Sequence, residues 1–213
     1  MKTHQTGFTL VEIAVVLLII GLLLGGVLKG QELIDSAKVK NLAQDFRSLP
    51  TLVHAYQDRF RALPGDDASA RLHLCPGGDE CTSPGNGNGL IDGNWDDTGA
   101  SDSFRFWQHV RLAGFATGSS DTANPDYLPR NAVGGRLGVQ RGGSLLGIRG
   151  SILTCSSGIP GKLVRQLDLA LDDGNPAEGS MRAGLDDGSG SLTPVSGSTP
   201  LDDGTSYTVC ASL

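Results

Sequence analysis

Aromatic side chains are scarce in this chain. Phe, Trp and Tyr together make up 5% of the 213 residues, whereas glycine alone occurs 31 times. Aromatic residues supply much of the buried area of a densely packed core, and glycine marks turns and irregular backbone. The sequence therefore predicts a loop-rich domain with a modest core rather than a densely packed enzyme.

Clusters of basic residues and catalytic motifs are also missing. The formal net charge is −6, and no basic patch of the kind that binds nucleic acid stands out. We find no zincin helix, phosphate-binding loop, nucleophile elbow or Cys–His pairing. The four histidines show no metal-ligand spacing, and His109 lies off the apolar positions, so we expect it to be solvated. These absences argue against an enzyme and give no support to nucleic-acid binding.

One long apolar run is present near the N-terminus. Residues 8–28 contain a single ionisable side chain, Glu12. A helix rises about 1.5 Å per residue, so this run is just long enough to cross a hydrocarbon core of about 30 Å. A carboxylate at the centre of a bilayer costs about 2.5–3.5 kcal/mol on insertion scales, so Glu12 needs a partner. The simplest interpretation is a single-pass membrane anchor or an uncleaved signal.

The residues before this run favour a more specific interpretation. A short polar leader ends at the small residue Gly7, and the apolar run begins abruptly at Phe8. A secretory signal peptide is cut after its apolar stretch, whereas here the small residue precedes that stretch. The segment Gly7-Phe8-Thr9-Leu10-Val11-Glu12 resembles the processing signature of type IV prepilins and type II secretion pseudopilins.

This resemblance implies a processing route and a set of partners. A prepilin peptidase and N-methyltransferase would cut between Gly7 and Phe8 and methylate Phe8. Glu12 would guide assembly by pairing with the N-terminal amine of a neighbouring subunit, which would remove the burial cost of both charges. The protein would first lie in the inner membrane, with its globular domain in the periplasm. It would then pass to a pilus, a secretion pseudopilus or the cell surface.

The rest of the chain is predicted to form an α+β fold of the pilin type. Apolar residues recur at threes and fours to about Arg61, which predicts a long helix with an amphipathic second half, kinked at Pro50. We therefore divide the chain into a leader (1–7), a membrane-spanning or filament-core half-helix (8–28), an amphipathic half-helix (29–61) and a globular domain (62–213). The second half of the helix would pack on an antiparallel sheet with loop-rich insertions.

Further elements are predicted within the globular domain. Residues 102–115 are predicted to form a short helix capped by Asp102 or Ser103, with Trp107 buried in the core. Another short helix is expected over 162–171, where leucines recur at helical spacing. Strands are expected over 136–140, 144–148, 151–155 and 206–211.

All four cysteines lie beyond the apolar run. An even number of cysteines in an exported domain predicts two disulfides, and three pairings are possible. Cys75 and Cys81 flank a tight loop, so we favour Cys75–Cys81 together with Cys155–Cys210. A zinc site is disfavoured because the spacing matches no zinc pattern.

Two kinds of segment rich in acidic or amide side chains are candidate calcium-binding sites. Asn86, Asn88 and Asp92 match ligand positions of an EF-hand loop, but its first and last carboxylate ligands are missing, so an ordinary Asn-Gly turn is the alternative. The sequence Leu-Asp-Asp-Gly occurs at 171–174, 185–188 and 201–204. These acids would bind calcium if the three loops converge, or would serve only as turn residues. The expected cofactor is therefore none, or calcium.

Taken together, these features predict a prepilin-like structural subunit. A globular region this large and loop-rich favours a minor or specialised subunit of a type IV pilus or a type II secretion pseudopilus. The alternative is a cell-surface binding or adhesion module that uses the same anchor, with a ligand held by the loops of residues 63–131.

Overall fold

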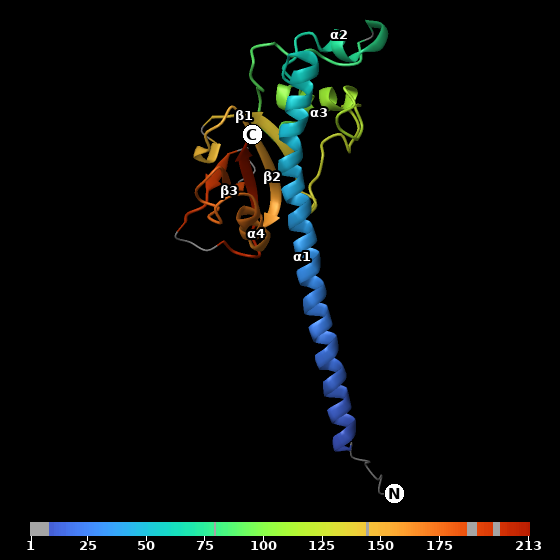
Figure 1. Cartoon of the computed structure of the whole chain (residues 1–213), viewed down its shortest axis with the longest axis vertical. Helices are drawn as coiled ribbons and strands as arrows, with labels where there is room; N and C mark the ends of the chain where they lie inside the picture. Colours follow the sequence, from blue (N-terminus) through green and yellow to red (C-terminus); the bar gives the residue numbers. More distant parts are fainter. Residues whose placement is uncertain (1–8, 79, 144, 187–190, 198–200) are drawn as a thin grey trace, which may run out of the picture. The chain divides into compact units, whose positions relative to one another are not determined.

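The computed structural model describes residues 9–78, 80–143, 145–186, 191–197 and 201–213 (Figure 1). The chain divides into two compact units, residues 1–38 and 39–213. The predicted leader, with Gly7 and Phe8, lies outside the described residues.

The first helix, α1, runs from Leu10 to Phe60 and confirms the predicted long helix. Pro50 lies inside it, and the kink expected there stays a prediction. Its buried residues recur at threes and fours along one face, as an amphipathic helix requires. They are Val39, Leu42, Ala43, Phe46, Leu49, Val53 and Tyr56.

The second unit contains a five-stranded antiparallel sheet (Figure 1). Its spatial order is β1-β2-β5-β3-β4. The strands are β1 (Leu137–Arg141), β2 (Ile152–Pro160), β3 (Met181–Asp186), β4 (Leu192–Pro194) and β5 (Ser206–Ser212). The prediction of an antiparallel sheet is confirmed, although β2 continues five residues past its predicted end and the sequence pattern does not predict β3 or β4.

One predicted strand is wrong. Residues 145–147 form a 3-10 turn, η2 (Leu145–Gly147), in the region where we expected a strand over 144–148. Leu146 has a φ of 53° and Gly147 a φ of 70°. Backbone in this left-handed region cannot extend as a strand.

Four further helices complete the unit: α2 (Ala70–Leu74), the 3-10 turn η1 (Pro76–Gly78), α3 (Asp102–Leu112) and α4 (Gly161–Leu171). The cap of α3 is Ser101, whose hydroxyl accepts from the Phe104 amide at 3.3 Å, rather than the predicted Asp102 or Ser103. Trp107 is buried, as predicted for a core anchor.

The core lies on both faces of the sheet. On one face, Phe46 of α1 and Leu167 of α4 cluster with Val209 of β5, and Tyr56 and Val53 of α1 cluster with Val110 of α3. On the other, Trp95 and Ile148 from irregular segments cluster with the cysteines of β2 and β5. The second half of α1 therefore packs against the sheet and the helices beside it (Figure 1).

Both disulfides have the favoured pairing, Cys75–Cys81 and Cys155–Cys210. Cys155 and Cys210 are direct cross-strand partners in β2 and β5, and both are fully buried. The second bridge closes the longer loop, with a sequence separation of 55. A loop of that length is worth about 4 kcal/mol in the chain-entropy model.

Candidate functional site

The start of α1 is closed by a reciprocal pair of hydrogen bonds between Thr9 and Glu12. The Thr9 amide donates to Glu12 Oε2 at 2.8 Å, and the Glu12 amide donates to Thr9 Oγ1 at 3.3 Å. The Thr9 hydroxyl also donates to Oε2, at 2.7 Å. This arrangement is a capping box, in which the first helical amides that lack an intrahelical partner are satisfied by side chains. The spacing Thr-x-x-Glu in the sequence was the signal for it.

The apolar residues of α1 that follow are exposed. Between Leu10 and Leu28 the large apolar side chains are 46–88% exposed. Among the described residues, α1 is the one helix whose length and composition would allow it to cross a membrane. An apolar surface of this extent is unfavourable in water, so this segment needs lipid or other helices around it.

The loops that follow α1 are organised by two adjacent acidic residues. The Asp66 carboxylate accepts hydrogen bonds from the amides of Gly87, Asn88 and Gly89, at 2.7–3.1 Å. The Asp67 carboxylate accepts from the Tyr56 hydroxyl at 2.8 Å. Asp66 and Asp67 are 3% and 2% exposed. The Asn-Gly loop is therefore wrapped around an anion of the same chain.

The predicted calcium ligands do come together in this loop. Asn86 and Asn88 both donate their side-chain amides to Asp92 Oδ2, at 3.3 and 2.8 Å. Their side-chain oxygens accept instead from the backbone amides of Asn88 and Leu90, both at 2.9 Å. Arg141 lies 3.6 Å from the other oxygen of Asp92. Calcium binding by these three residues stays a prediction.

His109, expected to be solvated, is fully buried. Its Nδ1 accepts from the Gly65 amide at 2.9 Å, so Nε2 carries the proton and donates to the Ser83 carbonyl at 3.2 Å. Burial lowers the pKa of His109 to about 4, so the ring is neutral at pH 7. Gly65 has a φ of 92° and packs on the Asp102 carbonyl, where a side chain would collide. His109 thus joins two loops to α3.

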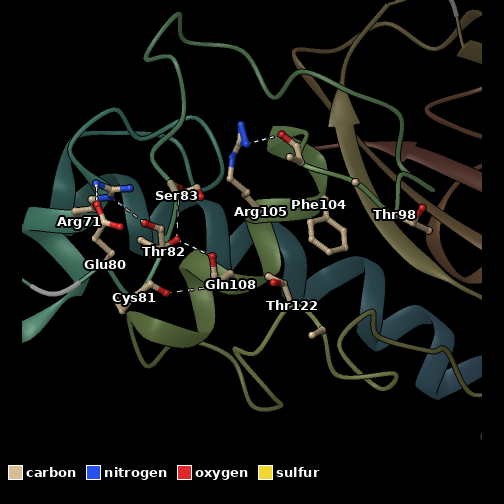
Figure 2. A pocket seen from close by; sticks show the side chains of 13 residues that line it. Arg71, Glu80, Cys81, Thr82, Ser83, Thr98, Phe104, Arg105, Gln108 and Thr122 are labelled. Carbon is tan, nitrogen blue, oxygen red and sulfur yellow. Dashed lines mark hydrogen bonds and ion pairs between the residues drawn. The ribbon is translucent and has the colours of Figure 1, made fainter.

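A hollow of about 590 Å³ opens between these loops and α3 (Figure 2). Gln108 lines it and accepts from the Thr82 hydroxyl at 2.6 Å. Arg71 on the wall donates to Glu80 at 2.6 Å and to the Thr82 carbonyl at 3.2 Å. The ring of Phe104 lines the other side, near Thr98 and Thr122 (Figure 2). The lining offers hydrogen-bonding groups and one aromatic face, which suit the binding of a ligand. The Thr82 hydroxyl donates to the side-chain amide of Gln108 rather than to a general base.

The N-terminal region of the chain matches a protein-family model. Residues 2–28 match the model of the prokaryotic N-terminal methylation motif. No curated protein and no solved structure matches the chain. The matched residues include Thr9 and Glu12 of the capping box and the whole exposed apolar segment, and proteins with this motif are structural rather than catalytic. Residues 2–28 thus carry the type IV prepilin and pseudopilin signature, on a chain whose long helix and antiparallel sheet are consistent with a pilin fold.

Proposed function

We propose that the chain is cut after Gly7, methylated at Phe8 and assembled through its N-terminal helix into a type IV pilus or a type II secretion pseudopilus. The observation that carries this proposal is the methylation motif over residues 2–28. The role is structural, and the chemistry belongs to the peptidase and methyltransferase that act on the chain.

The exposed apolar segment of α1 supports the assembly step. Burying one large aliphatic side chain is worth about 1.5–3 kcal/mol, and more than a dozen lie exposed between Leu10 and Leu28. Before assembly, lipid covers them. In the filament, the helices of neighbouring subunits replace the lipid.

Glu12 supplies the specific contact in this proposal. Both hydrogen bonds from Thr9 end on Oε2, so an amine can approach Oε1. The charge of a neighbour's Phe8 amine would neutralise the carboxylate as the helices pack.

Substitution of Glu12 tests the proposal, with Thr9 as a matched control. Thr9→Ala and Glu12→Ala both remove the capping box, at a cost of about 1 kcal/mol of helix stability. Only Glu12→Ala removes the charge. We expect both variants to be cleaved, and filament incorporation to fall at least about tenfold for Glu12→Ala but much less for Thr9→Ala. Incorporation of Glu12→Ala at the level of Thr9→Ala, measured by immunoblot of sheared filaments, would refute the role given to Glu12.

A minor or specialised subunit fits the chain better than a shaft subunit. The loops between α1 and β1 cover residues 61–136, and the described part of this stretch contains the helices α2, η1 and α3. A surface this irregular is more than packing in a filament shaft requires. We therefore expect it in far fewer copies than the main subunit of its filament.

The hollow beside α3 favours a second candidate function, a surface binding module that uses the pilin anchor. Its polar lining and the Phe104 ring would suit a glycan or a peptide. Saturable binding of such a ligand to the detergent-solubilised chain, lost in Phe104→Ala, would support this function. A chain that assembles normally and binds no glycan or peptide would exclude it.

A further inference from the structure

A second hollow adjoins the one beside α3. Its volume is about 240 Å³, and loop residues between 122 and 136 form most of its lining. Three residues, Thr98, Phe104 and Thr122, line both hollows. The two hollows are therefore parts of one groove, with Phe104 where they meet (Figure 2). We call it the Phe104 groove. The first hollow alone has the size of a small-molecule site, about 300–1,000 Å³.

The ring of Phe104 is held in place from behind. It packs on the Tyr127 ring, with 4.7 Å between the ring centroids. The Tyr127 hydroxyl donates to the Phe104 carbonyl at 2.7 Å, and Tyr127 itself is buried. The Phe104 amide donates to the hydroxyl of Ser101, the cap of α3. The groove therefore offers a fixed aromatic surface, so little side-chain freedom is lost when a ligand packs on it.

The Phe104 groove is basic, although the whole chain is acidic with a formal net charge of −6. Among the described residues, the charged side chains that line it are four arginines and one acid: Arg71, Arg105, Arg130, Arg136 and Glu80. In the first hollow the charges are compensated. Arg71 pairs with Glu80 at 2.6 Å, and Arg105 pairs with a buried acid of α3 at 3.2 Å.

In the second hollow the charges are not compensated. Arg130 and Arg136 line it together, and no acid of the described residues does. Through Nη1, Arg130 donates to the Gly134 carbonyl at 3.0 Å and Arg136 donates to the Asp96 carbonyl. None of the ion pairs among the described residues includes either arginine. A guanidinium has five N–H groups, so both side chains keep donors for an anion.

Arginines beside a fixed aromatic face suit a ring-shaped ligand that carries a carboxylate. Arginine binds carboxylates through two parallel hydrogen bonds. The exposed hydroxyls of Thr98 and Thr122 can bind the hydroxyls of a sugar, and the Phe104 ring can pack on the apolar face of that sugar. Peptides are commonly recognised by adding a strand to a sheet edge. None of the described residues that line the groove belongs to a strand.

We propose that the Phe104 groove binds an acidic polysaccharide, one whose sugars carry carboxylates. The carboxylate of one sugar binds Arg130 and Arg136, and the ring of that sugar packs on Phe104. The next sugars extend over the first hollow toward Gln108. This inference rests on the second candidate function given above, a surface binding module, and names the class of its ligand.

Calorimetric titration of the full-length chain in a neutral detergent tests the proposal. The probe is hexagalacturonate, and its matched control is the same hexamer with every carboxylate reduced to an alcohol. We expect saturable binding of the acidic hexamer and at least about tenfold weaker binding of the reduced one. Binding of the acidic hexamer should also weaken as the salt concentration rises from about 0.05 M to about 0.5 M.

Three variants assign the binding to the groove. Arg130 is exposed, so Arg130→Gln keeps the fold, and it should weaken binding of the acidic hexamer about tenfold. Phe104→Ala should weaken it at least about fivefold, and near-UV circular dichroism checks that this variant is folded. Arg149→Gln removes an exposed arginine that lines neither hollow and should leave the Kd unchanged.

Four results would overturn the proposal. The first is equal binding of the two hexamers, which would leave a module for neutral glycans. The second is tighter binding of hexaglutamate or of a thymidine hexanucleotide than of hexagalacturonate. The third is an equal loss of binding in Arg149→Gln and Arg130→Gln. The fourth is a chain that enters filaments and binds neither hexamer, which would leave the structural subunit alone. A chain that binds as expected but never enters filaments would instead refute the assembly role and keep this inference.

Discussion

His109 is held neutral inside the domain by two hydrogen bonds of opposite sense. Its Nδ1 accepts from Gly65 and its Nε2 donates to Ser83. A proton on Nδ1 would break the first bond and place a charge in the core. The pKa is therefore lowered from 6.5 to about 4, mainly by burial.

This pKa predicts acid sensitivity. Between pH 6.5 and pH 4 the unfolded chain binds a proton at His109 and the folded chain does not, so stability falls as the pH falls through this range. The loss amounts to about 3 kcal/mol. In His109→Asn the side-chain oxygen can keep the bond from Gly65 but cannot titrate. We expect that variant to be less stable at pH 7.5 by about 1–3 kcal/mol, yet to lose less stability on acidification.

The measurement is urea unfolding of the full chain in neutral detergent at several pH values. Burial raises the pKa of Asp45 to about 6, which changes stability in the opposite direction over the same range. The quantity to compare is therefore the difference between the variant and the parent. His54→Asn, at an exposed histidine, is the control. If His109→Asn loses as much stability on acidification as the parent does, the acid sensitivity does not come from His109.

His109 and Asp168 show what apolar patterning misses. The position of His109 off the apolar stripe predicts a solvated side chain, but α3 is buried around most of its circumference. Asp168 follows Val164 by four residues, so the two side chains lie on the same buried face of α4. The leucine spacing alone does not indicate that Asp168 is buried. A polar residue on a buried face is set by its tertiary partners, which lie far away in sequence.

Among the elements, the loop of residues 84–92 has no regular structure of its own and depends on Asp66. Three backbone amides, those of Gly87, Asn88 and Gly89, point at one carboxylate. Such an arrangement binds an anion, as oriented amides do in phosphate-binding loops. Asp66 therefore fixes this segment without an external ion.

Asp66→Asn should loosen this loop. The new side chain retains one oxygen for Gly87 and Asn88 but places an amide group, which is a donor, against the Gly89 amide. We expect a loss of about 2 kcal/mol of stability and faster hydrogen exchange at residues 87–89. Asp126→Asn serves as the control. Unchanged exchange at residues 87–89 would show that the loop is held by other contacts.

Sequence periodicity predicts the long or strongly amphipathic helices and strands well. Three elements, α1, α4 and β5, could be predicted directly from the spacing of their apolar residues, because each has an apolar face of its own. β3 and β4 could not, since short strands with Gly184 and Asp186 or Pro194 follow no alternation. The pairing of β3 with β5 and of β4 with β3 decides their structure.

For the whole molecule, the proposed function rests on two features: a folded α+β unit and a helical segment whose apolar side chains are exposed. The hydrogen bonds, disulfides and core of residues 39–213 account for the first. Under the proposed function, a membrane covers the second feature first, and neighbouring subunits cover it in the filament. The α+β class and the methylation signature of residues 2–28 could be predicted from the sequence because both depend on local pattern.

The most direct test of this account is the N-terminus of the mature chain. The full-length protein would be expressed with and without a prepilin peptidase, and its mass and terminal sequence determined. A bulky substitution, Gly7→Trp, provides the matched control and should stay uncut. The account predicts a chain that begins at methylated Phe8 only when the peptidase is present. A chain that stays uncut with the peptidase, or one cut beyond Leu28, would contradict it and reduce α1 to an ordinary anchor or signal.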